Sequence, residues 1–163
     1  MVGPSIEVRP ERPDHPEVAA LLAELDQYLG GLYAPAENHI LDIAALKSPE
    51  ITFLVAQHGA RVVGCGAVRR MSGEPSTDGV GYAEVKRMMV CPSMRGQRIG
   101  EQVLARLEAT VRAEGVKLAL LETGALQTAA VRLYERCGYR RRNSFGGYPD
   151  NGLSLFLEKR LVS

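Results

Sequence analysis

The feature that most constrains this chain is a strand-like run that leads through a proline and two glycines into a strongly periodic helix. The run Tyr82–Cys91 is rich in apolar residues, and Arg98–Glu114 follows with apolar side chains at three- and four-residue steps: Ile99, Val103, Leu104, Leu107 and Val111. A buried-type strand at Leu118–Glu122 comes next. A helix between two strands indicates that these strands are locally parallel.

The rest of the chain alternates strands and helices in the same way. The early strands and their turn at His58–Ala60 favour an antiparallel hairpin, and Tyr139–Arg142 is expected to pair with the last strand. Met71–Gly79 is irregular and is interpreted as a loop, so one domain over residues 1–163 is predicted. The further predicted elements are strands at Ser5–Arg9, Ile51–Ala56, Val62–Val68 and Gly152–Glu158, and helices at Pro13–Tyr28, Glu37–Leu46 and Thr128–Cys137.

The composition excludes several classes of protein. Hydrophobic residues make up 45% and charged residues 24%, both ordinary values for a globular domain. The longest apolar run is Val18–Ala23, too short to cross a bilayer, and no export signal is visible at the N-terminus. The three cysteines are odd in number and lack CxxC spacing, which favours reduced thiols. A cytoplasmic protein without membrane contact is therefore expected.

The charge is unevenly distributed along the chain. Residues 1–80 hold 6 basic and 11 acidic residues, whereas residues 81–163 hold 14 basic and 8 acidic residues. A basic half suggests an anionic partner, although charge alone favours a merely solvated basic face. Nucleic acid is not expected to be that partner, because the only dense basic run is Arg140–Arg142 and no nucleic-acid-binding motif accompanies it.

Most catalytic motifs do not occur. There is no GxxxxGK[ST] phosphate loop and no GxSxG elbow, and Gly64–Gly66 is interpreted as strand glycines. His15, His39 and His58 lack a metal-ligand spacing, so no metal is expected.

One anion site is indicated, where the strand meets the helix. Gly96 and Gly100 allow close approach of the backbone, and free N–H groups at a helix start bind phosphate groups.

These residues resemble the acetyl-CoA-binding motif of the GNAT acetyltransferase superfamily. In the segment MMVCPSMRGQRIG the family pattern falls on Val90, Pro92, Arg95, position 98 and Gly100. A second block, QTAAVRLYERCGY, is similar to the family's following helix, and LETG at Leu121–Gly124 lies where the family has its fifth strand. The resemblance implies an α/β fold with a mixed, mostly antiparallel sheet of about seven strands, splayed in the middle and flanked by about four helices.

The resemblance also implies roles for individual residues. Tyr134 would be the general acid, Glu84 the family's carboxylate base, and the Met88 backbone N–H the donor to the tetrahedral oxyanion. Pantetheine would pair with the strand end, and the diphosphate would lie at the helix start. The implied cofactor-binding residues are Met88, Met89, Val90, Arg95, Gly96, Gln97, Arg98, Ile99, Gly100, Gln127, Ala130 and Tyr134. Two positions depart from the family: Arg98 replaces a glycine, and Gln127 stands where asparagine is commoner.

Alternatives remain for each role. Tyr134 is also compatible with a core position, and Glu84 with a surface pair to Lys86; as a base, Glu84 would act directly, through water or not at all. The implied activity is transfer of an acetyl group from acetyl-CoA to the primary amine of a small molecule, amino acid or peptide. A non-catalytic acetyl-CoA-binding module is the alternative. A homodimer is common in the family, and the acceptor region would include Tyr33, Glu37, His39, loop 71–79 and residues 148–151.

Overall fold

The computed structural model describes residues 5–34 and 40–162, and Glu37 and His39 lie outside these ranges. Seven strands and four α-helices are present in the described residues, and the strand order is β1-β2-β3-β4-β5-β7-β6. The elements are β1 (Ile6–Pro10), α1 (Pro16–Leu32), α2 (Ile43–Leu46), β2 (Ile51–His58), β3 (Arg61–Met71), the short helix η2 (Pro75–Thr77), β4 (Tyr82–Val90), the short helix η3 (Pro92–Met94), α3 (Ile99–Arg112), β5 (Leu118–Gly124), α4 (Thr128–Arg136), β6 (Arg140–Arg141) and β7 (Ser154–Arg160).

The chain forms two compact units. The N-terminal unit comprises residues 1–68 and 86–107, and the C-terminal unit comprises residues 69–85 and 108–163. Strands β3 and β4 each run from one unit into the other. The mixed α/β sheet predicted from the sequence is confirmed, whereas one domain over residues 1–163 stays a prediction.

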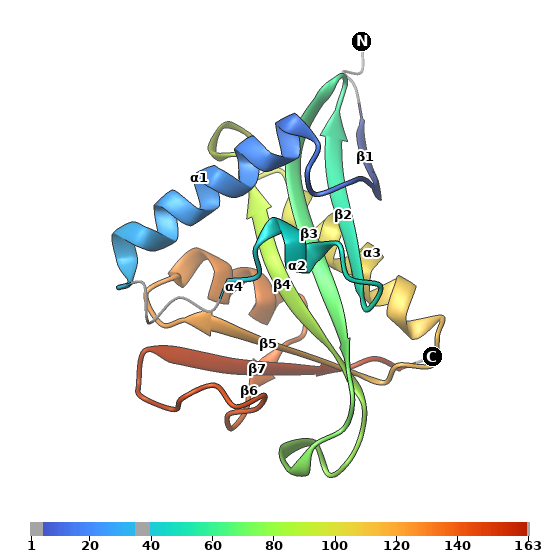
Figure 1. Cartoon of the computed structure of the whole chain (residues 1–163), viewed down its shortest axis with the longest axis vertical. Coiled ribbons are helices and arrows are strands. Elements are labelled where there is room, and N and C mark those ends of the chain that lie inside the picture. The colour runs from blue at the N-terminus through green and yellow to red at the C-terminus, as the bar shows by residue number, and fades with distance from the viewer. Residues whose placement is uncertain (1–4, 35–39, 163) are drawn as a thin grey trace. The chain divides into compact units, whose positions relative to one another are not determined.

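In the N-terminal unit, α1 and α2 cover one face of β2 and β3, and α3 passes along the other face (Figure 1). The first face buries a cluster of α1, α2 and strand side chains, listed as Val18, Leu21, Leu22, Leu25, Leu46, Phe53, Val55, Cys65, Ala67 and Met89. On the second face, a Cβ added to Gly66 would lie 2.5 Å from Met88 Sδ and 2.9 Å from Val103 Cγ1. The glycine in β3 is therefore required for α3 to pack this closely.

In the C-terminal unit, β5 is the central strand. It pairs in parallel with β4 at Ala83↔Ala119 and Glu84↔Leu120, and antiparallel with β7 over the whole of Leu118–Gly124. Strand β7 also pairs antiparallel with β6. An aromatic cluster covers one face of this part of the sheet, made of Tyr82, Leu120, Phe145 and Phe156, with Tyr148 packed against it.

Two predicted elements differ from the observed ones. The predicted helix Glu37–Leu46 is wrong over residues 40–42, because the Oδ1 atom of Asp42 accepts a hydrogen bond from the Ala45 N–H at 2.8 Å and the helix begins after this cap. The predicted helix Pro13–Tyr28 begins instead at Pro16 and continues to Leu32. His15 caps its start, since its side chain accepts a hydrogen bond from the Glu17 N–H.

Strand β4 has a backbone irregularity near its end. Arg87 has a φ of 58°, a left-handed conformation typical of a β-bulge. Arg87 and Met89 are buried, while Lys86, Met88 and Val90 are half-buried. Alternating burial therefore continues to the end of the strand despite this irregularity.

Candidate active site

The predicted anion loop lies in the N-terminal unit between β4 and α3. After β4 the chain forms η3, and residues 95–98 then lead into α3 with exposed side chains. The first hydrogen bond of the helix runs from the Gln102 N–H to the Arg98 carbonyl at 3.2 Å. The N–H groups of Arg98, Ile99 and Gly100 therefore have no acceptor within the helix, and together with the helix dipole they can bind an anion.

The backbone of this loop is left-handed at two positions. Gly96 has a φ of 81° and Arg98 a φ of 61°. Arg98 therefore has the left-handed backbone conformation that glycine favours, although it carries a Cβ. The Cβ costs about 1 kcal/mol of backbone strain in this conformation. The strain concerns only the backbone and the Cβ of Arg98. Its guanidinium is exposed and can reach a phosphate group.

Glycine at position 98 should relieve this strain. We expect Arg98→Gly to have a free energy of unfolding about 1 kcal/mol above that of Arg98→Ala, since both lose the guanidinium and only alanine keeps the Cβ. Urea denaturation of the two variants measures the difference. Equal stabilities would show that the left-handed conformation carries no strain.

Several predicted cofactor residues have side chains that are buried or bonded within the protein. The side chain of Met89 is buried in the core cluster, and Ile99 is buried against Gly64 of β3. The Nε atom of Arg95 donates to the carbonyl of Val90 at 3.3 Å, so this side chain links the loop to the end of β4.

The predicted second block lies on α4 in the C-terminal unit. Gln127 stands at the helix N-cap without a side-chain capping bond, and Gln127 and Ala130 are half-buried. Tyr134 is 7% exposed, and its ring meets the ring of Tyr139 edge-on at 5.9 Å. Burial raises the pKa of Tyr134 above the ordinary value of 10, and the charges of Cys137 and Glu122 raise the pKa further.

Glu84 lies in the C-terminal unit at the centre of a polar cluster. Its side chain is 1% exposed. The Nη2 atom of Arg69 donates to Oε1 at 2.9 Å, and the Tyr148 hydroxyl donates to Oε2. The alternative of a surface position for Glu84 is wrong, because the strand buries Glu84 beside β5.

Tyr148 and Tyr134 share an electrostatic neighbour. Burial raises the pKa of Tyr148, followed by the charge of Glu84 and its hydrogen bond, and Glu122 raises the pKa further. Glu122 also raises the pKa of Tyr134. The carboxylate of Glu122, on β5, therefore acts on both hydroxyls.

The three arginines of the basic run Arg140–Arg142 differ in their exposure to solvent. Arg140 and Arg141, which form β6, are exposed. Arg142 is half-buried instead, and its Nη2 atom donates to the Ser76 carbonyl at 2.7 Å.

Comparison with known proteins gives a consistent result. Residues 18–139 match the model of the family described as Acetyltransferase (GNAT) family. The chain belongs to the GNAT acetyltransferase family. It is 45% identical over 158 residues to the IAA acetyltransferase of Azospirillum brasilense, covering 97% of this chain and 99% of that protein.

Solved GNAT structures show the same fold. A structure from Klebsiella pneumoniae, described as an acyl-CoA N-acyltransferase, superposes with a TM-score of 0.78 at 33% identity and covers 96% of this chain and 98% of that one. The PaiA N-acetyltransferase of Thermoplasma acidophilum, solved with coenzyme A, gives a TM-score of 0.72 at 18% identity and covers 96% of this chain and 99% of that one.

Membership of the GNAT family confirms the predicted class of enzyme. The protein is an acyltransferase that uses acetyl-CoA as its co-substrate. The matched range includes both the loop before α3 and Tyr134 on α4. No helix among the described residues is long and apolar enough to span a membrane, and within the same residues no group of three or more His, Cys, Asp or Glu side chains could hold a metal ion.

Sequence reasoning missed the partners of Glu84 in this GNAT enzyme. Tyr148 appeared only as part of the expected acceptor region, and Arg69 was assigned no role. Both lie far from Glu84 in the sequence, at separations of 64 and 15 residues. No local pattern joins them, although a tyrosine in an otherwise glycine-rich loop was an available signal.

Proposed function

We propose that this protein is an N-acetyltransferase that transfers the acetyl group of acetyl-CoA to a primary amine by direct attack through a tetrahedral intermediate. The observation that carries the proposal is the buried Glu84 carboxylate, which Arg69 and Tyr148 hold in place. The chain also retains Tyr134 at the position where the family has its general acid, and a module that only binds the cofactor has no need of a donor to the sulfur.

The cofactor is proposed to bind through backbone groups. The N–H groups at the start of α3 would hold the diphosphate, with Arg95 and Arg98 adding positive charge, and Met88, Met89 and Val90 would pair with pantetheine as an added strand does. The half-buried Gln127 and Ala130 of α4 would line the path towards the sulfur. The full proposed set is Met88, Met89, Val90, Arg95, Gly96, Gln97, Arg98, Ile99, Gly100, Gln127, Ala130 and Tyr134.

The amine must lose a proton before or during attack. An alkylamine with a pKa near 10 is neutral in only about one part in a thousand at pH 7. Glu84 is proposed to take up this proton, directly or through a bound water. Arg69 and Tyr148 are positioning residues in this scheme, since they contact the Glu84 carboxylate.

The leaving thiolate and the oxyanion need hydrogen-bond donors. The N–H of Met88 is proposed to donate to the oxyanion, where one such donor is worth about 3 kcal/mol of barrier. Tyr134 is proposed to donate to the sulfur. Because burial raises the pKa of Tyr134 further above that of a thiol, full proton transfer becomes less favourable, and stabilisation by a hydrogen bond is the larger contribution.

The raised pKa of Tyr134 predicts a pH profile. A tyrosine that acts in its protonated form keeps acting to higher pH when its pKa is raised, so kcat should show no alkaline decline caused by Tyr134 below pH 10. The profile is measured with saturating amine and acetyl-CoA, for the native protein and for Tyr134→Phe. An alkaline limb below pH 10 that disappears in Tyr134→Phe would contradict the prediction.

The activity itself is tested by release of free thiol from acetyl-CoA. The acceptor panel comprises alkylamines, polyamines, amino acids and peptides, together with IAA, the compound in the name of the Azospirillum relative. Turnover with any amine supports the proposal. Binding of acetyl-CoA without turnover on the whole panel would favour the non-catalytic module.

Two accompanying proposals concern the state of the protein. The three cysteines are free thiols, which supports a reducing compartment such as the cytoplasm. A homodimer is proposed from the family alone, and light scattering on the purified protein measures its mass.

A further inference from the structure

A second cavity lies in the C-terminal unit. Its volume is about 690 Å³, within the range of small-molecule sites. The end of α3, the start of β5, the end of β7 and the loop that contains η2 form its walls. None of the residues proposed for catalysis or cofactor binding lines it, although Ser76, Thr77 and Asp78 of the expected acceptor loop do.

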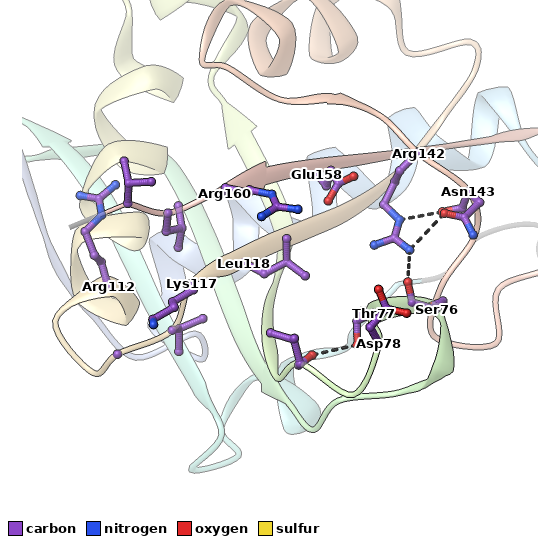
Figure 2. A pocket seen from close by; sticks show the side chains of 15 residues that line it. Ser76, Thr77, Asp78, Arg112, Lys117, Leu118, Arg142, Asn143, Glu158 and Arg160 are labelled. Atoms are coloured by element: carbon purple, nitrogen blue, oxygen red, sulfur yellow. Dashed lines mark hydrogen bonds between the residues drawn. The ribbon is translucent and has the colours of Figure 1, made fainter.

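Basic side chains dominate the charge of this cavity. Arg112, Lys117, Arg142 and Arg160 line it, against the two carboxylates Asp78 and Glu158. Figure 2 shows Arg112 and Lys117 at one end, Arg142 and Asn143 at the other, and Arg160 between them. The cations therefore extend along the cavity and do not gather at one point.

Three of these cations form no ion pair within the part of the chain that the structure describes. Within the ranges that the structure describes, no hydrogen bond or ion pair is recorded for the side chains of Arg112, Lys117 or Arg160. The Nε atom of Arg112 is in addition buried without a partner. A buried donor without an acceptor is costly, and an anionic ligand would satisfy it.

The fourth cation is already engaged. Arg142 donates from Nη2 to the Ser76 carbonyl at 2.7 Å and from Nε to the Asn143 carbonyl at 2.9 Å, so it ties the η2 loop to the segment after β6. The opposite wall is fixed by the Leu161 N–H, which donates to the Lys117 carbonyl at 2.8 Å. The cavity walls are thus held in place by bonds within the protein, and this favours a preformed site.

We propose that this cavity binds a small molecule that carries a phosphate or diphosphate group. Guanidinium groups bind phosphate oxygens in a bidentate manner, and a phosphate offers more acceptor oxygens than a carboxylate to three separated cations. The phosphate or diphosphate group lies along the row formed by Arg112 and Lys117 at one end of the cavity and Arg160 in its middle. The apolar side chains of Val116, Leu118 and Leu161 contact the body of the ligand.

The test uses inorganic pyrophosphate as the probe. Isothermal titration calorimetry is performed on the full chain with saturating coenzyme A, which fills the diphosphate site before α3. We expect one pyrophosphate to bind per chain. Absence of binding to the protein saturated with coenzyme A would overturn the proposal, as would binding of succinate with equal affinity.

Variants locate the binding. Arg160→Gln and Arg112→Gln should each weaken pyrophosphate binding about tenfold or more, because each removes charge-assisted hydrogen bonds. Arg61→Gln is the matched control, since it removes the same charge from an exposed arginine that does not line the cavity. Equal weakening in all three variants would show binding by net charge alone and overturn the proposal.

A second measurement guards against misfolding. Amide NMR shifts of the native protein saturated with coenzyme A should move at Lys117, Leu118 and Glu158 when pyrophosphate is added. Shift changes confined to residues outside the cavity lining would also overturn the proposal.

Discussion

Replacement of Glu84 by glutamine should lower turnover about a hundredfold, the lower end of what a general base contributes. Glutamine keeps the volume of the side chain and its ability to bond to Tyr148, but it cannot accept the amine's proton. The KM for acetyl-CoA should change by less than about twofold, because Glu84 is not among the proposed cofactor contacts. Initial rates of thiol release over a range of acetyl-CoA concentrations separate the two quantities.

Glu108 provides a matched control for this experiment. It is a buried carboxylate like Glu84, and it likewise accepts from one tyrosine and one cation, Tyr139 at 2.8 Å and Lys159 at 2.8 Å. Glu108→Gln should lower the free energy of unfolding by about 1–3 kcal/mol and leave turnover intact. If Glu108→Gln lost as much turnover as Glu84→Gln, the effect would come from folding and the base role would be wrong.

The pH dependence of turnover in Glu84→Gln distinguishes proton uptake by Glu84 from a purely structural role of this residue. Below the pKa of the amine, its neutral fraction increases about tenfold for each unit by which the pH is raised. The difference in turnover between Glu84→Gln and the native protein should therefore shrink as the pH approaches 10. A deficit that is constant from pH 7 to pH 10 would contradict proton uptake by Glu84.

Tyr134→Phe should lower turnover between about tenfold and a hundredfold. A hydrogen bond to a charged group is worth about 1.5–3 kcal/mol, and the phenyl ring cannot donate to the leaving thiolate. The affinity for acetyl-CoA should change little, because the sulfur gains charge only as the bond breaks. Turnover numbers and a calorimetric Kd for acetyl-CoA measure both effects on the same sample.

Tyr139 is the control for Tyr134, because the two rings are in contact and both are buried. The hydroxyl of Tyr139 is bonded to Glu108, so Tyr139→Phe should destabilise the fold through that carboxylate while turnover is retained. Full turnover in Tyr134→Phe would exclude a role of its hydroxyl in the reaction.

Much of the fold could be predicted from local patterns. Helix α3 was recognised because its apolar residues recur at helical spacing, and the central strands because they are rich in apolar and β-branched residues. The helix before β2 was predicted too long, because the Asp42 cap was not recognised in a segment without strong periodicity. The left-handed conformation of Arg87 was not predicted either, because arginine is not a residue type that indicates a positive φ.

For the candidate site too, the parts encoded by short sequence blocks could be predicted and the parts formed by distant residues could not. The loop before α3 and Tyr134 of α4 belong to short sequence blocks, where residue type and spacing are themselves the signal. The partners of Glu84 carry no such signal, because Arg69 on β3 and Tyr148 in the segment before β7 meet it only after both have packed beside β4.

The sequence by itself determined the order of strands and helices, the position of the loop before α3 and the class of enzyme, because each depends on residues close together along the chain. Only the tertiary structure decided the surroundings of Glu84, and only the tertiary structure brought Arg112, Lys117 and Arg160 around one cavity. The physical reason is that burial and charge pairing depend on which distant segments become neighbours, and those neighbours are fixed by sheet pairing and by the packing of helices and loops against the sheet.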